Sequence, residues 1–178
     1  SAASDVYKRQ DKVQGKTMVE AALEINHWCA GEVMYQGTDM RTGSALEIYR
    51  SGVGRCGEEA VFVVNVMRSA GIPARPVYVP RWSHCDDNHA WVEVWCDGDW
   101  HYLGACEPEA VLDKSWFTNA ASRAMMIGSR WYDRAMPDEK VIGKDGMNRI
   151  INLLGKYAKT RWITITVEDL DGTCLLYT

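Results

Sequence analysis

The sequence contains no apolar run of the length that a membrane span requires, about 20 residues. It also has no excess of basic residues, since 20 Lys and Arg stand against 24 Asp and Glu, and the formal net charge is −4. That balance gives no reason to expect binding to nucleic acid or to an anionic membrane surface. Internal repeats, low-complexity tracts and CxxC pairs are absent as well. A length of 178 residues then indicates one main domain with a sizeable core.

Both ends of the chain resemble translated sequencing-library DNA. Residues 5–10 resemble a transposon end, residues 1–4 resemble the adjoining adaptor, and residues 174–178 resemble the same transposon end read from the opposite strand. We therefore expect residues 1–10 and 174–178 to be artefacts, and we exclude them from the fold prediction. Residues 11–173 are expected to be an internal piece of a longer protein.

The cysteines outside these ends are odd in number, so at least one thiol stays free even if the others pair. They are Cys29, Cys56, Cys85, Cys96 and Cys106. Their number does not settle the redox compartment.

Cys56 lies at the predicted start of a buried helix. Gly54 and Gly57 bracket it, the apolar run 60–67 follows, and Gly-Ile-Pro at 71–73 ends the helix. Free backbone N–H groups and the positive end of the helix dipole stabilise a thiolate at such a position. A buried structural cysteine is the alternative, because free cysteine is among the most buried residue types. We interpret Cys56 as a nucleophile.

The remaining elements follow from the periodicity of apolar residues. Helices are predicted over residues 16–33 and 45–49, and strands over 73–80, 88–96 and 99–103. The last two strands form a hairpin through Asp97-Gly98. These elements predict an α+β fold in which the nucleophile helix packs on an antiparallel sheet.

A second alternating segment begins near residue 161, where Ile163, Ile165 and Val167 alternate with threonines. This pattern predicts a strand. We expect residues 161–173 to open a truncated, β-rich domain that follows a first domain of residues 11–160.

A nucleophilic cysteine needs a base, and His89 is the best placed of the four histidines. It begins the strand 88–96 and follows a polar loop that could open onto a cleft. His84, within that loop, is the alternative base. A surface histidine at a strand end is the non-catalytic interpretation.

Several segments together resemble the transglutaminase-like superfamily. They are Gly-Arg-Cys-Gly-Glu at 54–58, Gly-Ile-Pro-Ala-Arg at 71–75, Asn-His-Ala-Trp-Val-Glu-Val-Trp at 88–95, and Trp100. The resemblance covers about residues 45–113. It implies a papain-like α+β fold, a Cys-His-Asp triad, and acyl transfer from an amide through a thioester to water or an amine. It further implies a secreted or cell-envelope protein with β-sandwich modules downstream, and no cofactor.

Within that superfamily, residues 55–58 and 100–107 also resemble peptide:N-glycanases, which cleave the amide between a glycan and asparagine. The resemblance therefore implies a protein or glycopeptide substrate. The sequence departs from the family pattern at Gly104, where the third triad member would be an aspartate. Glu107 is the nearest replacement, and a bulge at Gly104 could bring it into place. Glu109 and Asp113 are the alternatives.

The sequence thus predicts a thiol enzyme acting on amide bonds, a protease or amidase ahead of a cross-linking transferase, with Cys56, His89 and Glu107 as catalytic residues. Glu58 and Glu59 are interpreted as first-turn acids that favour the helix dipole. A catalytically inactive module that binds protein or glycan is the competing hypothesis, because glycine at 104 cannot orient an imidazole.

A metal site is the third hypothesis, and its ligands would be His84, Cys85, His89 and Cys106. Their spacing fits no zinc template, so we expect no metal.

Overall fold

The computed structural model describes residues 13–37, 42–132, 137–161, 163 and 165–167. Its elements in chain order are α2 (Met18–Glu32), β1 (Met34–Tyr35), α3 (Ala45–Ser51), β2 (Val53–Gly54), α4 (Cys56–Ser69), β3 (Ala74–Val79), β4 (His89–Cys96), β5 (Asp99–Leu103), α5 (Thr118–Ala121), β6 (Gly128–Trp131), β7 (Val141–Asp145), β8 (Asn148–Asn152) and α6 (Leu154–Tyr157). The helices and strands predicted between residues 16 and 103 are confirmed within a few residues.

Six strands form one antiparallel sheet in the order β5-β4-β3-β6-β8-β7. In the register of the sheet, His89 at the start of β4 lies opposite Val79 at the end of β3, and Val92 lies opposite Leu103 of β5. Strands β6, β7 and β8 lie between residues 103 and 161, where the sequence analysis predicts no elements. Strands β1 and β2 form a separate parallel pair beside the start of α4.

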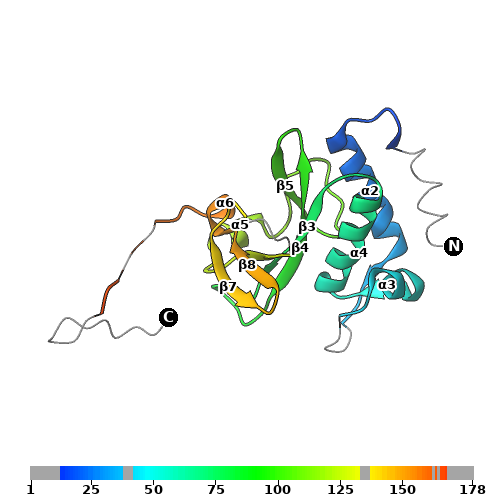
Figure 1. Cartoon of the computed structure of the whole chain (residues 1–178). Coiled ribbons are helices and arrows are strands. Elements are labelled where there is room, and N and C mark those ends of the chain that lie inside the picture. The colour runs from blue at the N-terminus through cyan, green and yellow to red at the C-terminus, as the bar shows by residue number, and fades with distance from the viewer. Residues whose placement is uncertain (1–12, 38–41, 133–136, 162, 164, 168–178) are drawn as a thin grey trace.

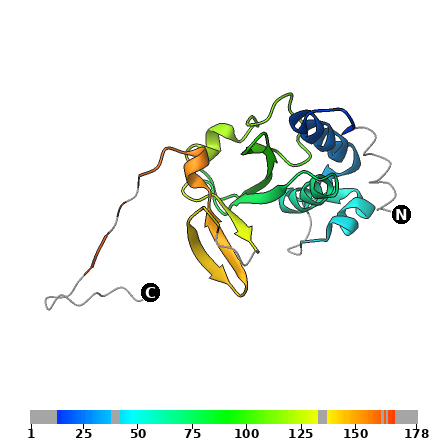
Figure 2. The same ribbon diagram turned by 45° about the horizontal axis from the view of Figure 1, so that its top comes forward.

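Helices α2, α3 and α4 gather on one side of β3 and β4, whereas β7, β8 and α6 lie on the other side (Figure 1). The turned view keeps the same separation, with the blue and cyan helices apart from the orange strands (Figure 2). Helix α4, which begins at Cys56, therefore packs on the antiparallel sheet, and the α+β prediction is confirmed.

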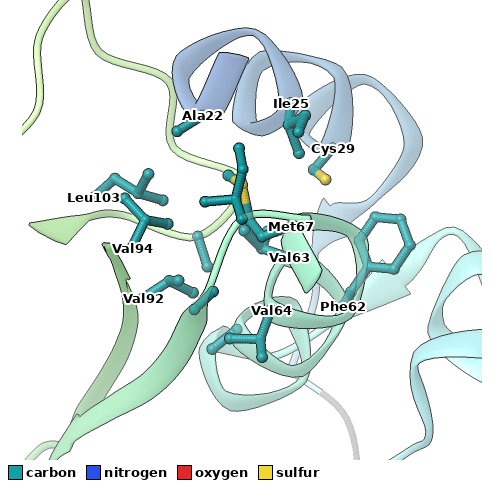
Figure 3. Packing of buried hydrophobic residues seen from close by; sticks show 14 of the residues in the cluster. Ala22, Ile25, Cys29, Phe62, Val63, Val64, Met67, Val92, Val94 and Leu103 are labelled. Atoms are coloured by element: carbon teal, nitrogen blue, oxygen red, sulfur yellow. The ribbon is translucent and has the colours of Figure 1, made fainter. Parts of the chain in front are cut away.

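The alternation along β4 supplies two hydrophobic cores. Val92 and Val94 point into the core between the sheet and the helices, where they meet Val63 and Met67 of α4 (Figure 3). Trp91, on the opposite face, belongs to a second core beneath α5 and α6. Period-2 side-chain direction thus lets one strand pack on α4 with one face and on the second core with its other face.

Capping residues fix where the first helices begin. The Thr17 hydroxyl accepts a hydrogen bond from the Glu20 N–H, and the Glu20 carboxylate accepts one from the Thr17 N–H. Ser44 and Glu47 make the same reciprocal pair at the start of α3. Such capping boxes satisfy N–H groups that have no partner inside the helix.

The strand predicted from residue 161 is not present among the described residues of that segment. Residues 161, 163 and 165–167 have no regular secondary structure, and Ile163 and Ile165 are exposed. A strand needs a neighbouring strand for its hydrogen bonds, and alternation alone does not supply one. Residues 1–12 and 168–178, which include both expected artefacts, lie outside the described residues. None of the described helices combines the length and hydrophobicity needed to cross a membrane.

Candidate active site

Cys56 is the first residue of α4, as the glycine-flanked motif predicts. Arg55, the N-cap residue, has extended backbone angles, so the chain turns sharply into the helix. A Cβ on Gly57 would meet nothing within 4 Å, and Gly57 lines the same cleft as the thiol. The glycine therefore leaves the approach to Cys56 open.

Glu58 stabilises the loop that leads into Cys56 and α4. Its Oε2 accepts the Arg55 N–H at 3.0 Å, and its Oε1 accepts the Gly43 N–H at 3.0 Å. A Cβ on Gly54 would lie 3.1 Å from the Glu58 Cβ, so this close approach favours glycine. The buried Glu58 side chain thus joins three segments around the start of α4.

His89, the first residue of β4, lies beside the thiol. The N–H of Ala90, the next residue, donates a hydrogen bond to the Cys56 sulfur. Both side chains line one cleft of about 640 Å³, together with Trp82, Glu107 and Trp116. The structure therefore brings Cys56 and His89 to the same cleft, as the sequence predicts. His84 lies in the exposed loop, with its ring 6.0 Å from that of Trp82.

Burial opposes charge on both groups. It raises the pKa of the Cys56 thiol, and the N–H groups of Ala90 and Gly57 offset this only in part. Burial also lowers the pKa of His89 to about 4, against a smaller upward effect of Asp87. At the helix start, where the sequence predicts a stabilised thiolate, desolvation thus outweighs the favourable N–H groups.

Glu107 does not reach its position through a bulge in a strand. Strand β5 ends at Leu103, and a tight turn follows in which the Glu107 N–H donates to the Gly104 carbonyl at 3.2 Å. The turn folds Glu107 back over Gly104, so a Cβ at 104 would lie 2.2 Å from the Glu107 Oε2. The carboxylate of Glu107 thus occupies the space that a side chain at 104 would fill.

Two neighbours hold this turn in place. The buried Asn26 side chain of α2 donates to the Gly104 carbonyl at 2.9 Å and accepts the Cys106 N–H at 3.0 Å. The Trp116 indole N–H donates to both carboxylate oxygens of Glu107, each at 3.0 Å. Burial raises the pKa of Glu107, and its hydrogen bonds to Trp116 and Ser115 partly offset the rise.

The alternative carboxylates have other partners. Asp113 Oδ2 lies 2.6 Å from Nδ1 of His101, and Glu109 Oε2 lies 3.3 Å from Nζ of Lys114. Glu107 lines the cleft with His89, yet no hydrogen bond joins the two among the described residues.

The sequence analysis did not identify the place of three residues at or near the site. Trp116 and Phe117, whose ring centroids lie 4.8 and 5.0 Å from that of His89, come from a segment without clear periodicity. Glu59 is buried and faces Glu107, and burial raises its pKa to about 8. Its sequence position suggests only a dipole partner, because the turn that brings Glu107 close is a tertiary feature. In the described parts of the chain, no group of three His, Cys, Asp or Glu residues is arranged to hold a metal ion.

Comparisons with known proteins agree with the sequence resemblance. A sequence profile described as the transglutaminase-like superfamily matches residues 7–105, more than half of the chain. No curated protein matches the sequence.

Three solved structures are similar to parts of this chain. A candidate cysteine protease from Cytophaga hutchinsonii is 19% identical, with a TM-score of 0.47, over 84% of this chain and 58% of that one. LapG from Legionella pneumophila is 16% identical, with a TM-score of 0.49, over 62% and 65%. A candidate protease from Parabacteroides distasonis is 19% identical, with a TM-score of 0.47, over 72% and 28%. The matches thus span less than two thirds of each of those proteins.

The family assignment rests on the sequence profile and on the residues that it covers, which include Cys56 and His89. Because the profile matches more than half of its residues, the chain belongs to the transglutaminase-like superfamily.

Proposed function

We propose that this protein is a thiol-dependent acyl-transfer enzyme that acts on amide bonds, with hydrolysis as its main reaction. The observation that carries the proposal is the shared cleft of Cys56 and His89, in which the N–H of the residue after the histidine contacts the thiol sulfur. A thiol and an imidazole facing one open space are the minimum that nucleophilic catalysis needs.

In the proposed reaction, the His89 imidazole takes the proton of the Cys56 thiol, and the sulfur attacks the carbonyl carbon of the amide. The C–N bond then breaks, and the amine leaves with the proton from His89. Water attacks the resulting thioester, which releases the acid and restores the thiol. An amine in place of water gives a cross-link. The Cys56 backbone N–H, at the start of α4, is the proposed donor to the oxyanion.

Glu107 is the proposed third member. Its support is positional, since its carboxylate fills the space above Gly104 and lines the cleft with His89. A protein or glycopeptide is the proposed acyl donor, and its support is the sequence resemblance to peptide:N-glycanases. The cleft that would receive it has a volume of about 640 Å³.

A catalytically inactive binding module is the second candidate function. One observation favours it: Nε2 of His89 is buried and has no hydrogen-bond partner among the described residues. Burial also raises the pKa of Cys56 and lowers that of His89, which opposes the thiolate–imidazolium pair.

The test is incubation of the wild type, Cys56→Ala and Cys85→Ala with peptides and N-glycopeptides. Released amine and acylated Cys56 are measured by mass spectrometry, and binding is measured on the same substrates. We expect turnover and an acyl adduct in the wild type and in Cys85→Ala, and neither in Cys56→Ala. Cys85→Ala is the control because the Cys85 side chain is exposed. Binding without turnover or adduct in all three proteins would support the binding module instead.

A further inference from the structure

The imidazole of His89 is enclosed by aromatic rings. Ring centroids lie 4.8 Å away for Trp116, 5.0 Å for Phe117, 6.0 Å for Trp91 and 6.3 Å for Trp82. No carboxylate of the described residues hydrogen-bonds its Nε2, although that atom is buried. A protonated imidazole at this place would therefore depend on ring faces, which attract a cation within about 6 Å of the centroid.

Trp116 differs from the other rings in two respects. Its side chain is 64% exposed, so it lies at the mouth of the cleft and not in the core. Its N–H is also bound by both oxygens of Glu107. The carboxylate charge thus lies one hydrogen bond away from the ring that is nearest to His89.

This arrangement depends on the glycine at 104. With any Cβ there, the Glu107 carboxylate would have to leave the place where it meets the indole, because the Glu107 Oε2 lies 2.2 Å from that Cβ position. The Asn26 side chain fixes the turn from below by binding the Gly104 carbonyl. On the turn held by Asn26, Glu107 is therefore hydrogen-bonded to Trp116, and the Trp116 ring lies next to that of His89.

We propose that Trp116 is a positioning residue that transmits the charge of Glu107 to His89, in place of a direct carboxylate–imidazole hydrogen bond. An N–H that donates to an anion becomes polarised, and electron density rises on the ring that carries it. The ring then stabilises the imidazolium more strongly. The inference rests on the proposed function and deepens it, since it says how this site favours the ionised pair against burial.

The step involved is a proton transfer. The S–H bond of Cys56 breaks, an N–H bond forms on the His89 imidazole, and no electrons leave the pair. Cys56 then carries a negative charge and His89 a positive charge inside the cleft. The Glu107–Trp116 pair lowers the free energy of the charged His89. Uncharged Cys56 and His89 gain nothing from it.

Other charged groups face the same pair. Asp87, in the loop before β4, also raises the pKa of His89. On α4, Arg55 lowers the pKa of Cys56 and Glu59 raises it. Glu59 also faces Glu107. These are charge–charge effects on the pKa, whereas Glu107 is joined to Trp116 by a hydrogen bond, so the indole hydrogen bond can be tested separately from them.

The experiment measures the rate of iodoacetamide labelling of Cys56 against pH, peptide by peptide, in the folded protein. The exposed Cys85 is labelled in the same samples and serves as an internal reference thiol. The variants are Trp116→Phe, which keeps a ring but removes the N–H, Glu107→Gln, and the two together. Trp95→Phe, which changes a partly exposed tryptophan at the other end of β4, is the matched control.

We expect Trp116→Phe and Glu107→Gln each to raise the apparent pKa of Cys56 labelling by up to about one unit, since each variant keeps a ring beside His89 and loses only part of a partly desolvated cation–π contact. The double variant should shift the pKa no more than either single variant, because each single variant already removes the Glu107–Trp116 hydrogen bond. Trp95→Phe and the Cys85 profile should stay unchanged. A pKa of His89 lowered in both single variants, measured by NMR, would support the same conclusion.

A shift in Glu107→Gln but not in Trp116→Phe would overturn the inference, since Glu107 would then act on His89 without the indole. Faster labelling of Trp116→Phe at every pH would also overturn it, because Trp116 would then only cover the thiol. Failure of the proposed function has a different signature: wild-type Cys56 would label like Cys85, and His89→Ala would change nothing.

Discussion

His89 and His101 lie on the adjacent strands β4 and β5, and their surroundings are opposite. His101 is partly exposed, and its Nδ1 lies 2.6 Å from a carboxylate oxygen of Asp113. His89 is buried among aromatic rings beside the Cys56 thiol, and no carboxylate binds its Nε2 in the described structure. His101 thus has the carboxylate partner, whereas His89 lies beside the Cys56 thiol.

In the proposed mechanism, the histidine that acts as the base is therefore not the histidine that has a carboxylate partner. Such a pair at the surface is solvated and contributes little to stability. In contrast, burial lowers the pKa of His89 to about 4. A strongly shifted pKa in a cleft, next to a possible nucleophile, is the more informative feature.

The largest expected effect separates the two histidines directly. We expect His89→Ala to reduce kcat/KM on an amide substrate by about 10²- to 10⁴-fold, the usual contribution of a general acid–base. His101→Ala should leave kcat/KM unchanged, because its imidazole is bonded to Asp113 and not to the thiol. Steady-state kinetics of both variants measures the difference, and equal losses would remove the distinction.

The next effect concerns Gly104, which leaves room for the Glu107 carboxylate in the cleft that contains His89. In Gly104→Ala, the new Cβ overlaps the Glu107 carboxylate, and we expect a loss of about 1–3 kcal/mol in the free energy of unfolding, as for other overpacked sites. Chemical denaturation measures it. Gly31→Ala in α2 is the control, since a Cβ there meets nothing within 4 Å and alanine favours the helix. An unchanged stability in Gly104→Ala would mean that Glu107 moves aside freely.

A smaller effect depends on pH and on Glu59. Its pKa is raised from 4.5 to about 8 by burial and by Glu107, so the folded state holds a proton that the unfolded state releases above pH 4.5. The contribution of this group to stability is therefore present at low pH and is lost as the pH rises through 8. We expect Glu59→Gln to raise Tm at pH 9 and to change it little at pH 5. Equal shifts at both values would exclude titration as the cause.

The smallest effect is expected at the other histidine. Asp113→Asn weakens the contact between residue 113 and His101. The side chain of His101 is 30% exposed and that of Asp113 is 48% exposed. Because solvent screens this pair, the loss should be below about 1 kcal/mol in unfolding free energy. Salt titration of wild type and variant checks the electrostatic origin, since the difference should shrink at high salt. A loss of amide turnover in Asp113→Asn would contradict the assignment of roles to the two histidines.

Much of the first half of the fold could be predicted from the sequence. Apolar periodicity located α2, α4 and β4, because the period of side-chain direction differs between helices and strands. The glycine-flanked Cys56 and the strand-leading His89 followed from the same reasoning, since motif and element boundaries are local. Strand β6 was not predictable in this way, because it pairs with β3 and β8, which are distant in the sequence. Strands β7 and β8 form a local hairpin, and the sequence analysis missed its Asp-Gly turn signal at 145–146.

The sequence by itself determined which residues could do chemistry: Cys56 at a helix start, His89 at a strand start, and a glycine at 104 that requires another source of a carboxylate. Only the tertiary structure decided what those residues experience. Burial shifts the pKa values of Cys56 and His89 against ionisation, and the turn at Gly104 directs Glu107 to the indole of Trp116. Reactive groups are a local property of the chain, whereas desolvation and contacts between distant segments exist only after folding.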